Sequence, residues 1–227
     1  MRFEYTEIWG IENALRGMRN PMKSWNKSDS AINTKTGIFV IGKEDLKLAQ
    51  TLIKAGTEHR KFMRQIFVSV DITAPLYWWK EFDTYKVGTT ANSTSTMHKI
   101  ATEPITMSDF ELSDYKEMTV LDDYHLVGDF AVTIVNGLEA LRQKYVSTKD
   151  MTYWKELIRW LPESWLQTRT VTMNYENILT ITKQRKGHKL SEWRTFVTWA
   201  YALPYAKELL NIDLSEQTDS THNGNQS

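Results

Sequence analysis

The chain of 227 residues contains no cysteine. Disulfides, thiolate metal sites and cysteine nucleophiles are therefore excluded, and a reducing cytoplasm fits this absence. The chain also has no net charge, because 28 Lys and Arg balance 28 Asp and Glu, so no global field attracts nucleic acid or an anionic membrane. No apolar run approaches the roughly 20 residues that span a bilayer, and the first ten residues, MRFEYTEIWG, lack a secretory signal pattern. We therefore expect a cytoplasmic protein that binds neither nucleic acid nor membrane.

Several common chemical motifs are also missing. There is no glycine-rich phosphate loop, no dinucleotide-binding glycine triplet and no helical His-Glu zinc pair. The histidines are far apart in the sequence, so we predict no metal site; they are His59, His98, His125, His188 and His222.

What the chain does have is a large aromatic content, with nine tryptophans and ten tyrosines. Such side chains supply apolar area with a polar tip, and most of them are expected in the core or at subunit interfaces. The length suits a single domain, which we place over residues 1–212. The polar residues 213–227 lack core formers and are expected to be disordered.

Hydrophobic periodicity indicates a mostly helical chain with a few strands. Alternating residues predict strands at 3–9 and 167–173, and a β-branched run covers 66–73. Residues 17–37 are rich in Asn, Ser, Lys and Gly and predict a long loop. Helices are predicted over 44–55, 75–86, 120–141, 149–160, 174–184 and 190–210, and Pro204 is a candidate kink in the last of them.

Two segments contain the most information about function. The first is APLYWWKEFDTYKVGTTANSTSTMHK at 74–99, and the second is LPESWLQTRTVTMNYENILTITKQR at 161–185. Together they resemble the flavin-dependent thymidylate synthases, which methylate dUMP with FAD, NADPH and methylenetetrahydrofolate. The resemblance extends over about two-thirds of the chain, and it implies an α+β fold in which a small sheet packs with long helices.

In that family a helix that begins near Ala-Pro contains Arg-Gln and then, three residues later, Arg-His-Arg. Lys80 and Glu81 fall on the Arg-Gln pair. Thr84, Tyr85 and Lys86 fall on Arg-His-Arg.

The family helix is followed by a Ser and by a loop that ends in Ser-x-Arg-Tyr. Thr89 falls on the first Ser and, with one extra loop residue, Ser95 falls on the second. Met97 and His98 then fall on Arg-Tyr. A plain turn or capping role explains the hydroxyl-rich run around Ser95 equally well.

The second segment keeps the same register. Leu-Pro at 161–162 and Thr-Met-Asn at 172–174 match the family, as does Arg185. Glu176 falls where the family has a substrate-contacting arginine. Asn174 suits either a ligand contact or the cap of the helix that follows, and we favour the cap.

The resemblance implies FAD as the cofactor, NADPH and methylenetetrahydrofolate as co-substrates, and a homotetramer with sites at subunit junctions. By this resemblance the catalytic residue is Ser95, and the cofactor-binding residues are Thr84, Tyr85, Lys86 and Asn174. The implied substrate-binding residues are Lys80, Glu81, Thr89, Ser95, Glu176 and Arg185.

Three family arginines are replaced, by Thr84, Met97 and Glu176. Arginine binds phosphate through a planar, permanently charged fork, so these changes predict weak or no dUMP binding unless other cations substitute. Three functions are compatible with the sequence: a diverged thymidylate synthase, a relative that binds another nucleotide or flavin, and a non-catalytic assembly protein. The candidate substitute cations are Arg60, Arg64, Arg169 and Arg194.

Overall fold

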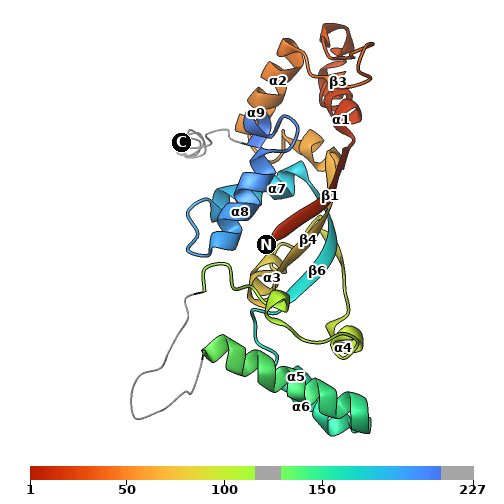
Figure 1. Cartoon of the computed structure of the whole chain (residues 1–227). Helices are drawn as coiled ribbons and strands as arrows, with labels where there is room; N and C mark the ends of the chain where they lie inside the picture. The colour runs from red at the N-terminus through yellow and green to blue at the C-terminus, as the bar shows by residue number, and fades with distance from the viewer. Residues whose placement is uncertain (116–128, 211–227) are drawn as a thin grey trace, which may run out of the picture. The chain divides into compact units, whose positions relative to one another are not determined.

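The computed structural model describes residues 1–115 and 129–210. The strands are β1 (Arg2–Trp9), β2 (Ala31–Ile32), β3 (Phe39–Val40), β4 (Phe67–Pro75), β5 (Thr90–Ser93) and β6 (Leu166–Asn174) (Figure 1). The α-helices are α1 (Ile11–Met18), α2 (Lys43–Lys54), α3 (Leu76–Phe82), α4 (Thr96–Lys99), α5 (Phe130–Thr148), α6 (Met151–Arg159), α7 (Tyr175–Arg185), α8 (Ser191–Tyr201) and α9 (Ala206–Leu210). Short 3₁₀ helices are η1 (Asn20–Met22), η2 (Trp25–Lys27), η3 (Lys61–Gln65) and η4 (Met107–Asp109).

The main sheet has four strands in the order β1-β4-β6-β5, and β2 and β3 form a separate antiparallel pair. Val68, Val70 and Ile72 are buried at every second position of β4, which is the period of a strand with one covered face. Val171 and Met173 repeat this pattern on β6. A small sheet with longer helices confirms the expected α+β fold class.

The described residues divide into two compact units. Unit 1 comprises residues 1–2, 71–84, 92–115 and 129–170, and unit 2 comprises residues 3–70, 85–91 and 171–210. The single domain expected over 1–212 remains a proposal. Its last two residues and the tail at 213–227 lie outside the described residues, as does the 120–128 part of the helix predicted over 120–141.

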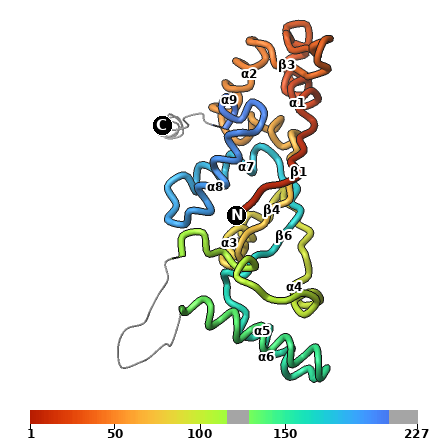
Figure 2. Tube along the Cα trace, in the orientation of Figure 1, coloured from red at the N-terminus to blue at the C-terminus, as the bar shows by residue number. Residues whose placement is uncertain are grey.

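Unit 1 is built around α5 and α6, which pack side by side (Figure 2). Asp129 caps α5 by accepting from the amide of Val132, and Asp150 caps α6 by accepting from the amide of Thr152. The rings of Trp78, Trp79 and Phe82 contact one another within α3. One hydrophobic cluster of this unit consists of Ile100, Ile105, Phe110, Val135, Leu138 and Leu157.

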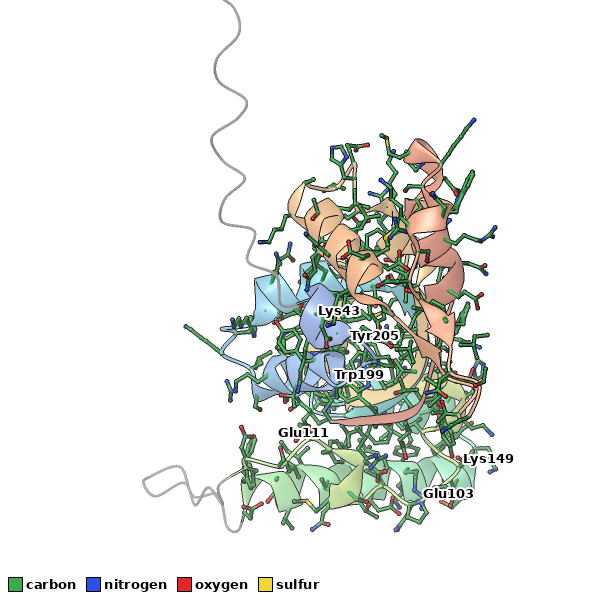
Figure 3. All side chains as sticks on the ribbon, turned by 90° about the horizontal axis from the view of Figure 1, so that it is seen from above. Lys43, Glu103, Glu111, Lys149, Trp199 and Tyr205 are labelled. Atoms are coloured by element: carbon green, nitrogen blue, oxygen red, sulfur yellow. The ribbon has the colours of Figure 1, made fainter. Side chains whose placement is uncertain are left out.

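Unit 2 has an aromatic core on α8 and a buried ion pair near its first helices. Phe3 of β1 stacks on Trp199 of α8 with ring centroids 4.6 Å apart. Tyr205 lies between α8 and α9, and its hydroxyl accepts from the amide of Ile41 at 3.1 Å. Figure 3 labels both Trp199 and Tyr205.

Asp45 is fully buried in the same unit and fixes the segment before α2. Its carboxylate accepts from Nε of Arg19 at 2.5 Å and from the hydroxyls of Ser28 and Ser30, each at 2.6 Å. These contacts join residues up to 26 positions apart. The prediction of a long loop over 17–37 is wrong, because this anchored segment contains the end of α1, η1, η2 and β2.

Two further predictions are wrong in extent. The helix predicted over 75–86 ends at Phe82, because the amide and hydroxyl of Thr84 both turn back to the carbonyl oxygen of Glu81, at 3.2 and 2.7 Å. The helix predicted over 190–210, with its candidate kink at Pro204, is interrupted there between α8 and α9, because Pro204 has no amide donor and Tyr205 has a φ of 56°.

Candidate functional site

The candidate site in unit 2 is the segment 85–91, here called the 85–91 loop. It contacts α7 at both ends of that helix. At the C-terminal end, the Tyr85 hydroxyl donates to Oε1 of Gln184 at 2.9 Å and accepts from Nε of Arg185 at 2.8 Å. The sequence predicted Tyr85 and Arg185 as site residues, and the fold brings their side chains into contact across 100 positions.

Arg185 is held flat by aromatic rings. Its guanidinium carbon lies 4.4 Å from the ring centroid of Trp193 and 5.6 Å from that of Tyr85. Trp193 is fully buried, so the cation rests on a fixed surface. Trp193 was not predicted, because nothing in its local sequence shows that Arg185 stacks on it.

The N-terminal end of α7 binds the other side of the loop. Asn174 and Asn177 cap this helix reciprocally, with N–H···O distances of 3.0 and 3.1 Å. Nδ2 of Asn177 donates to the carbonyl oxygen of Val87 at 2.7 Å. Gly88 has a φ of 75°, and a Cβ built there would lie 3.0 Å from the Asn177 side chain. The capping role favoured for Asn174 is confirmed. The Asn-x-x-Asn spacing in the sequence is the feature that could have indicated Asn177 as its partner.

The turn of the 85–91 loop is open to solvent. Val87 is 88% exposed, and Lys86 and Gly88 are also exposed. The Thr89 hydroxyl donates to the carbonyl oxygen of Tyr85 and so ties the loop to itself. Lys86 therefore offers a charged donor at a fixed turn.

Glu176 lies in the first turn of α7 and is neutralised by two arginines. Arg60 Nε donates to its Oε1 at 3.0 Å, and Arg64 Nε donates to its Oε2. Burial disfavours the charged carboxylate, but the hydrogen bonds from Arg64 and Arg60 outweigh it and hold the pKa of Glu176 below its ordinary value. Two of the four candidate substitute cations thus gather where the resemblance placed a family arginine.

The other two candidate cations have different surroundings. In unit 1, Arg169 lies 4.2 Å from the ring centroid of Trp79 and donates to Asp83 at 2.8 Å. In unit 2, Arg194 Nη1 donates to the carbonyl oxygens of His188 and Lys189 at 3.3 and 3.2 Å.

The remaining predicted site residues belong to unit 1. Lys80 pairs with Glu163 at 2.6 Å on an exposed surface. Thr84 is exposed, and its hydroxyl is bonded to the Glu81 carbonyl oxygen. The structure brings together six predicted residues in unit 2: Tyr85, Lys86, Thr89, Asn174, Glu176 and Arg185. It places four in unit 1: Lys80, Glu81, Thr84 and Ser95.

Ser95 caps α4 and also contacts an imidazole. Its Oγ lies 2.6 Å from Nδ1 of His98 and accepts from the His98 amide at 3.3 Å. Ser95, Lys99, Glu103 and Asp109 are among the residues that line a cavity of about 220 Å³ in unit 1. The capping role is confirmed, and Ser95 also lines this cavity.

A larger cavity, of about 540 Å³, lies in unit 2 between the end of α1, α2 and η3. Leu48, Leu52 and Phe62 give it an apolar lining, with His59 and Lys61 also on its wall. None of the predicted site residues lines it.

The donors at the 85–91 loop fit an anionic cofactor. Lys86 and Arg185 offer positive charge there, whereas Asn174 and Glu176 are engaged within the protein. Among residues 1–115 and 129–210, no three metal-ligating side chains come together, and none of the helices there is long and apolar enough to cross a bilayer.

No protein-family model matches this chain, and no curated protein matches it in sequence. Solved structures do match. One is flavin-dependent thymidylate synthase ThyX from Helicobacter pylori complexed with FAD and dUMP, with a TM-score of 0.65 and 15% identity over 92% of this chain and 97% of that one. A second structure, of Thymidylate Synthase X from Helicobacter pylori with FAD and dUMP, gives the same values. This chain therefore has the ThyX fold.

Proposed function

We propose that the protein is a flavin-dependent thymidylate synthase-like protein that binds a flavin or nucleotide at the 85–91 loop. The observation that supports this most is the contact of Tyr85 with Arg185, because it joins the two segments that suggested the family. Two solved structures of the same fold contain FAD and dUMP.

In the full activity, dUMP would be methylated with reduced flavin and methylenetetrahydrofolate, and NADPH would reduce the flavin. FAD would supply the redox chemistry. Lys86 and Arg185 would bind its anionic part, and Tyr85 would hold Arg185 in place. By the family resemblance, Ser95 would be the catalytic residue. We further propose that the protein is cytoplasmic and that it forms a homotetramer. Light scattering of the purified protein would test the oligomeric state.

A second candidate is a protein of the same fold that binds a different nucleotide or flavin ligand. The observation that favours it is the Glu176 carboxylate, which has two arginine donors where the family has an arginine. The hydrogen bonds to this carboxylate occupy donors of both arginines, so fewer guanidinium donors are left here for a phosphate. A non-catalytic assembly protein remains the third proposal.

The test is a flavin titration followed by calorimetry with dUMP. If FAD binds, an absorption band at about 450 nm is expected to elute with the protein in gel filtration. For dUMP added to the FAD-loaded protein, we expect a Kd above about 10 μM, or weaker than roughly −7 kcal/mol.

Absence of both bound flavin and bound nucleotide would contradict the principal proposal. A dUMP Kd below about 10 μM would show that Arg60 and Arg64 replace the missing arginines, and it would reject the second candidate. Turnover of dUMP to dTMP with NADPH and methylenetetrahydrofolate would separate an enzyme from an assembly protein.

A further inference from the structure

The cavity of about 540 Å³ in unit 2 has an apolar floor, and no residue of the 85–91 loop lines it. Met18 at the end of α1 is 8% exposed, and Phe62 on η3 is 4% exposed. Leu48 and Leu52 of α2 also line the cavity, and their four-residue spacing puts both side chains on one face of that helix. Close-packed proteins leave few voids larger than a water molecule, so a space of this size invites a ligand.

The rim of the cavity is polar and open to solvent. Met22 lines the cavity and is 82% exposed, so the cavity opens to solvent beside this residue. Glu58 and Lys61 also line it, and their side chains are 81% and 63% exposed. An apolar floor below a polar rim fits an amphiphile, with its apolar part inside and its polar head at the rim.

A buried ion pair ties one wall of the cavity to the other. Arg19 belongs to the first wall, at residues 17–24, and its Nε donates to Asp45 of α2 at 2.5 Å. Its Nη1 donates to the carbonyl oxygen of Ser24, in the same wall, at 3.4 Å. Asp45 lies three residues before Leu48, on the same side of α2. Because both partners are buried, the pair resists separation and holds the two walls at a fixed distance, which preorganises the cavity for a ligand.

The charges at the rim favour an uncharged head group. Among the described residues that line the cavity, the side chains with a full charge are Glu58 and Lys61, and they pair with each other at 3.5 Å. An anionic head would meet the carboxylate, and a cationic head would meet the ammonium group. The other polar side chains on the wall can bond a hydroxyl or an amide, and they are Asn20, Ser24, His59 and Gln65.

The lining favours an alkyl chain over a flat ring system. Among the described residues that line the cavity, Phe62 is the only Phe, Tyr or Trp, and no arginine is present. Nucleobases are commonly bound by stacking on aromatic or guanidinium planes, which this wall lacks apart from that one ring. Methionine side chains are flexible and adapt to an irregular apolar chain, and Met18 and Met22 are both part of the wall.

We propose that this cavity binds an uncharged amphiphile, a molecule with a medium-length alkyl chain and a hydroxyl or amide head. The alkyl chain lies against Met18, Leu48 and Phe62, and the head lies at the rim near Met22. The inference goes beyond the proposed function, because the flavin or nucleotide is placed at the 85–91 loop and this cavity has its own set of residues.

The test is a calorimetric titration of the full chain with the straight-chain alcohols butanol, hexanol and octanol. Affinity should rise about fourfold for each added CH₂, which corresponds to about 0.8 kcal/mol per group. Octanoate and octylammonium should each bind at least about fivefold more weakly than octanol, because their charged heads lose hydration at the rim. In protein labelled with carbon-13 at the methionine methyl groups, octanol should shift the signals of Met18 and Met22, which Met18→Leu and Met22→Leu assign.

A variant that fills the cavity tests the same site. Leu52→Phe should weaken octanol binding at least about tenfold, because the larger side chain occupies the space. Leu46→Phe is the matched control, since Leu46 is half-buried on the same helix but does not line the cavity, and it should change the affinity less than about twofold. Thermal unfolding checks that both variants fold, and the methionine signals test the site in the unsubstituted chain.

Four outcomes would overturn the inference. The first is an affinity that does not change with chain length, and the second is tighter binding of octanoate or octylammonium than of octanol. The third is an equal loss of octanol binding in Leu46→Phe and Leu52→Phe. The fourth is displacement of octanol by FAD, which would assign the cavity to the flavin. A protein that binds octanol but neither flavin nor nucleotide would reject only the proposed function.

Discussion

Glu176 accepts hydrogen bonds from two arginines that come from a segment more than 100 positions earlier in the chain. It is 14% exposed, so its charge is only partly screened by water. Its pKa is lowered by Arg64 and Arg60 against the effect of burial. A carboxyl group of this kind stabilises the folded state above its unfolded pKa, and this stabilisation is lost as the pH falls through the folded pKa.

Glu176→Gln should therefore lower the free energy of unfolding at pH 7 by about 1–2 kcal/mol, because two arginines lose their anion. The same variant should also lose less stability than the wild type on acidification below the ordinary carboxyl pKa of 4.5. Urea unfolding at pH 7 and pH 3.5 measures both effects. Glu58→Gln is the control, since Glu58 is 81% exposed and lies 3.5 Å from Lys61; an equal loss in this control would contradict the role given to the Glu176 ion pairs.

Arg185 combines a charge with a fixed orientation on Trp193. Arg185→Ala should weaken the binding of an anionic flavin or nucleotide at this site by about 1.5–3 kcal/mol. Arg185→Lys should recover only part of the affinity, because an ammonium group cannot stack as a planar guanidinium does. Flavin titration of the two variants, with thermal unfolding as a check on folding, measures this; normal binding by both would place the working site elsewhere.

At the scale of elements, the 85–91 loop depends on a close backbone approach at Gly88. This residue has a φ of 75°, and a Cβ there would lie 3.0 Å from Oδ1 of Asn177 and 3.1 Å from Nδ2 of Asn174. Gly88→Ala should destabilise the protein by about 1–2 kcal/mol, because a side chain disfavours the left-handed region. The helix cap of α7 should loosen with it.

Gly137→Ala is the matched control, since Gly137 is within α5 and a Cβ there meets nothing within 4 Å. It should stabilise the protein by about 0.5–1 kcal/mol through helix propensity. Thermal unfolding of the two variants should therefore shift in opposite directions. If both unfolding temperatures rose, the close contact between Gly88 and the asparagines that cap α7 would be contradicted.

The elements that could be predicted from the sequence are those set by local rules. The strand 167–173 and the helices 44–55, 149–160 and 174–184 all appear close to their expected bounds, because alternation, apolar spacing and capping are local. One error arises where a contact between residues distant in sequence orders the chain: Asp45 orders the segment that was predicted as a loop. Another error is local, because the hydroxyl of Thr84 bonds to the carbonyl oxygen of Glu81, three residues earlier, and ends a helix that was expected to continue.

The candidate site shows the same division. Tyr85, Asn174 and Arg185 could be named as candidates because they lie in segments that resemble a family. Trp193 could not be found, since only the packing of α7 against α8 brings it beneath Arg185. Arg60 and Arg64 were candidates to replace the family arginines because of their charge alone. Only the fold shows that both of them pair with Glu176.

At the scale of the whole molecule, the net charge is zero, yet several carboxylates have pKa values below their ordinary range. In Glu139, hydrogen bonds from Arg142 lower the pKa to about 2. For Asp45, burial opposes ionisation, but bonds from Ser28, Ser30 and Arg19 still lower the pKa. The unfolded chain takes up protons on such groups first, so acid favours unfolding.

Stability should therefore fall steadily between about pH 5 and pH 2. Replacing Glu139 by Gln should remove part of this dependence and cost about 1–2 kcal/mol at pH 7, after allowance for its partial exposure. Calorimetric unfolding across this pH range measures both. A wild-type unfolding temperature that does not change down to pH 3 would contradict the assigned ionisation states.

The solvent-exposed tip at Val87 has a practical consequence for measurement. The chain contains no thiol, so Val87→Cys would create a single reactive sulfur at the most exposed large apolar residue among those described. A spin label attached there would report the motion of this tip on the nanosecond timescale with no background signal. If an anionic ligand binds at Lys86, the spectrum of the label should broaden on titration, and the half-point would give an affinity that needs neither colour nor turnover.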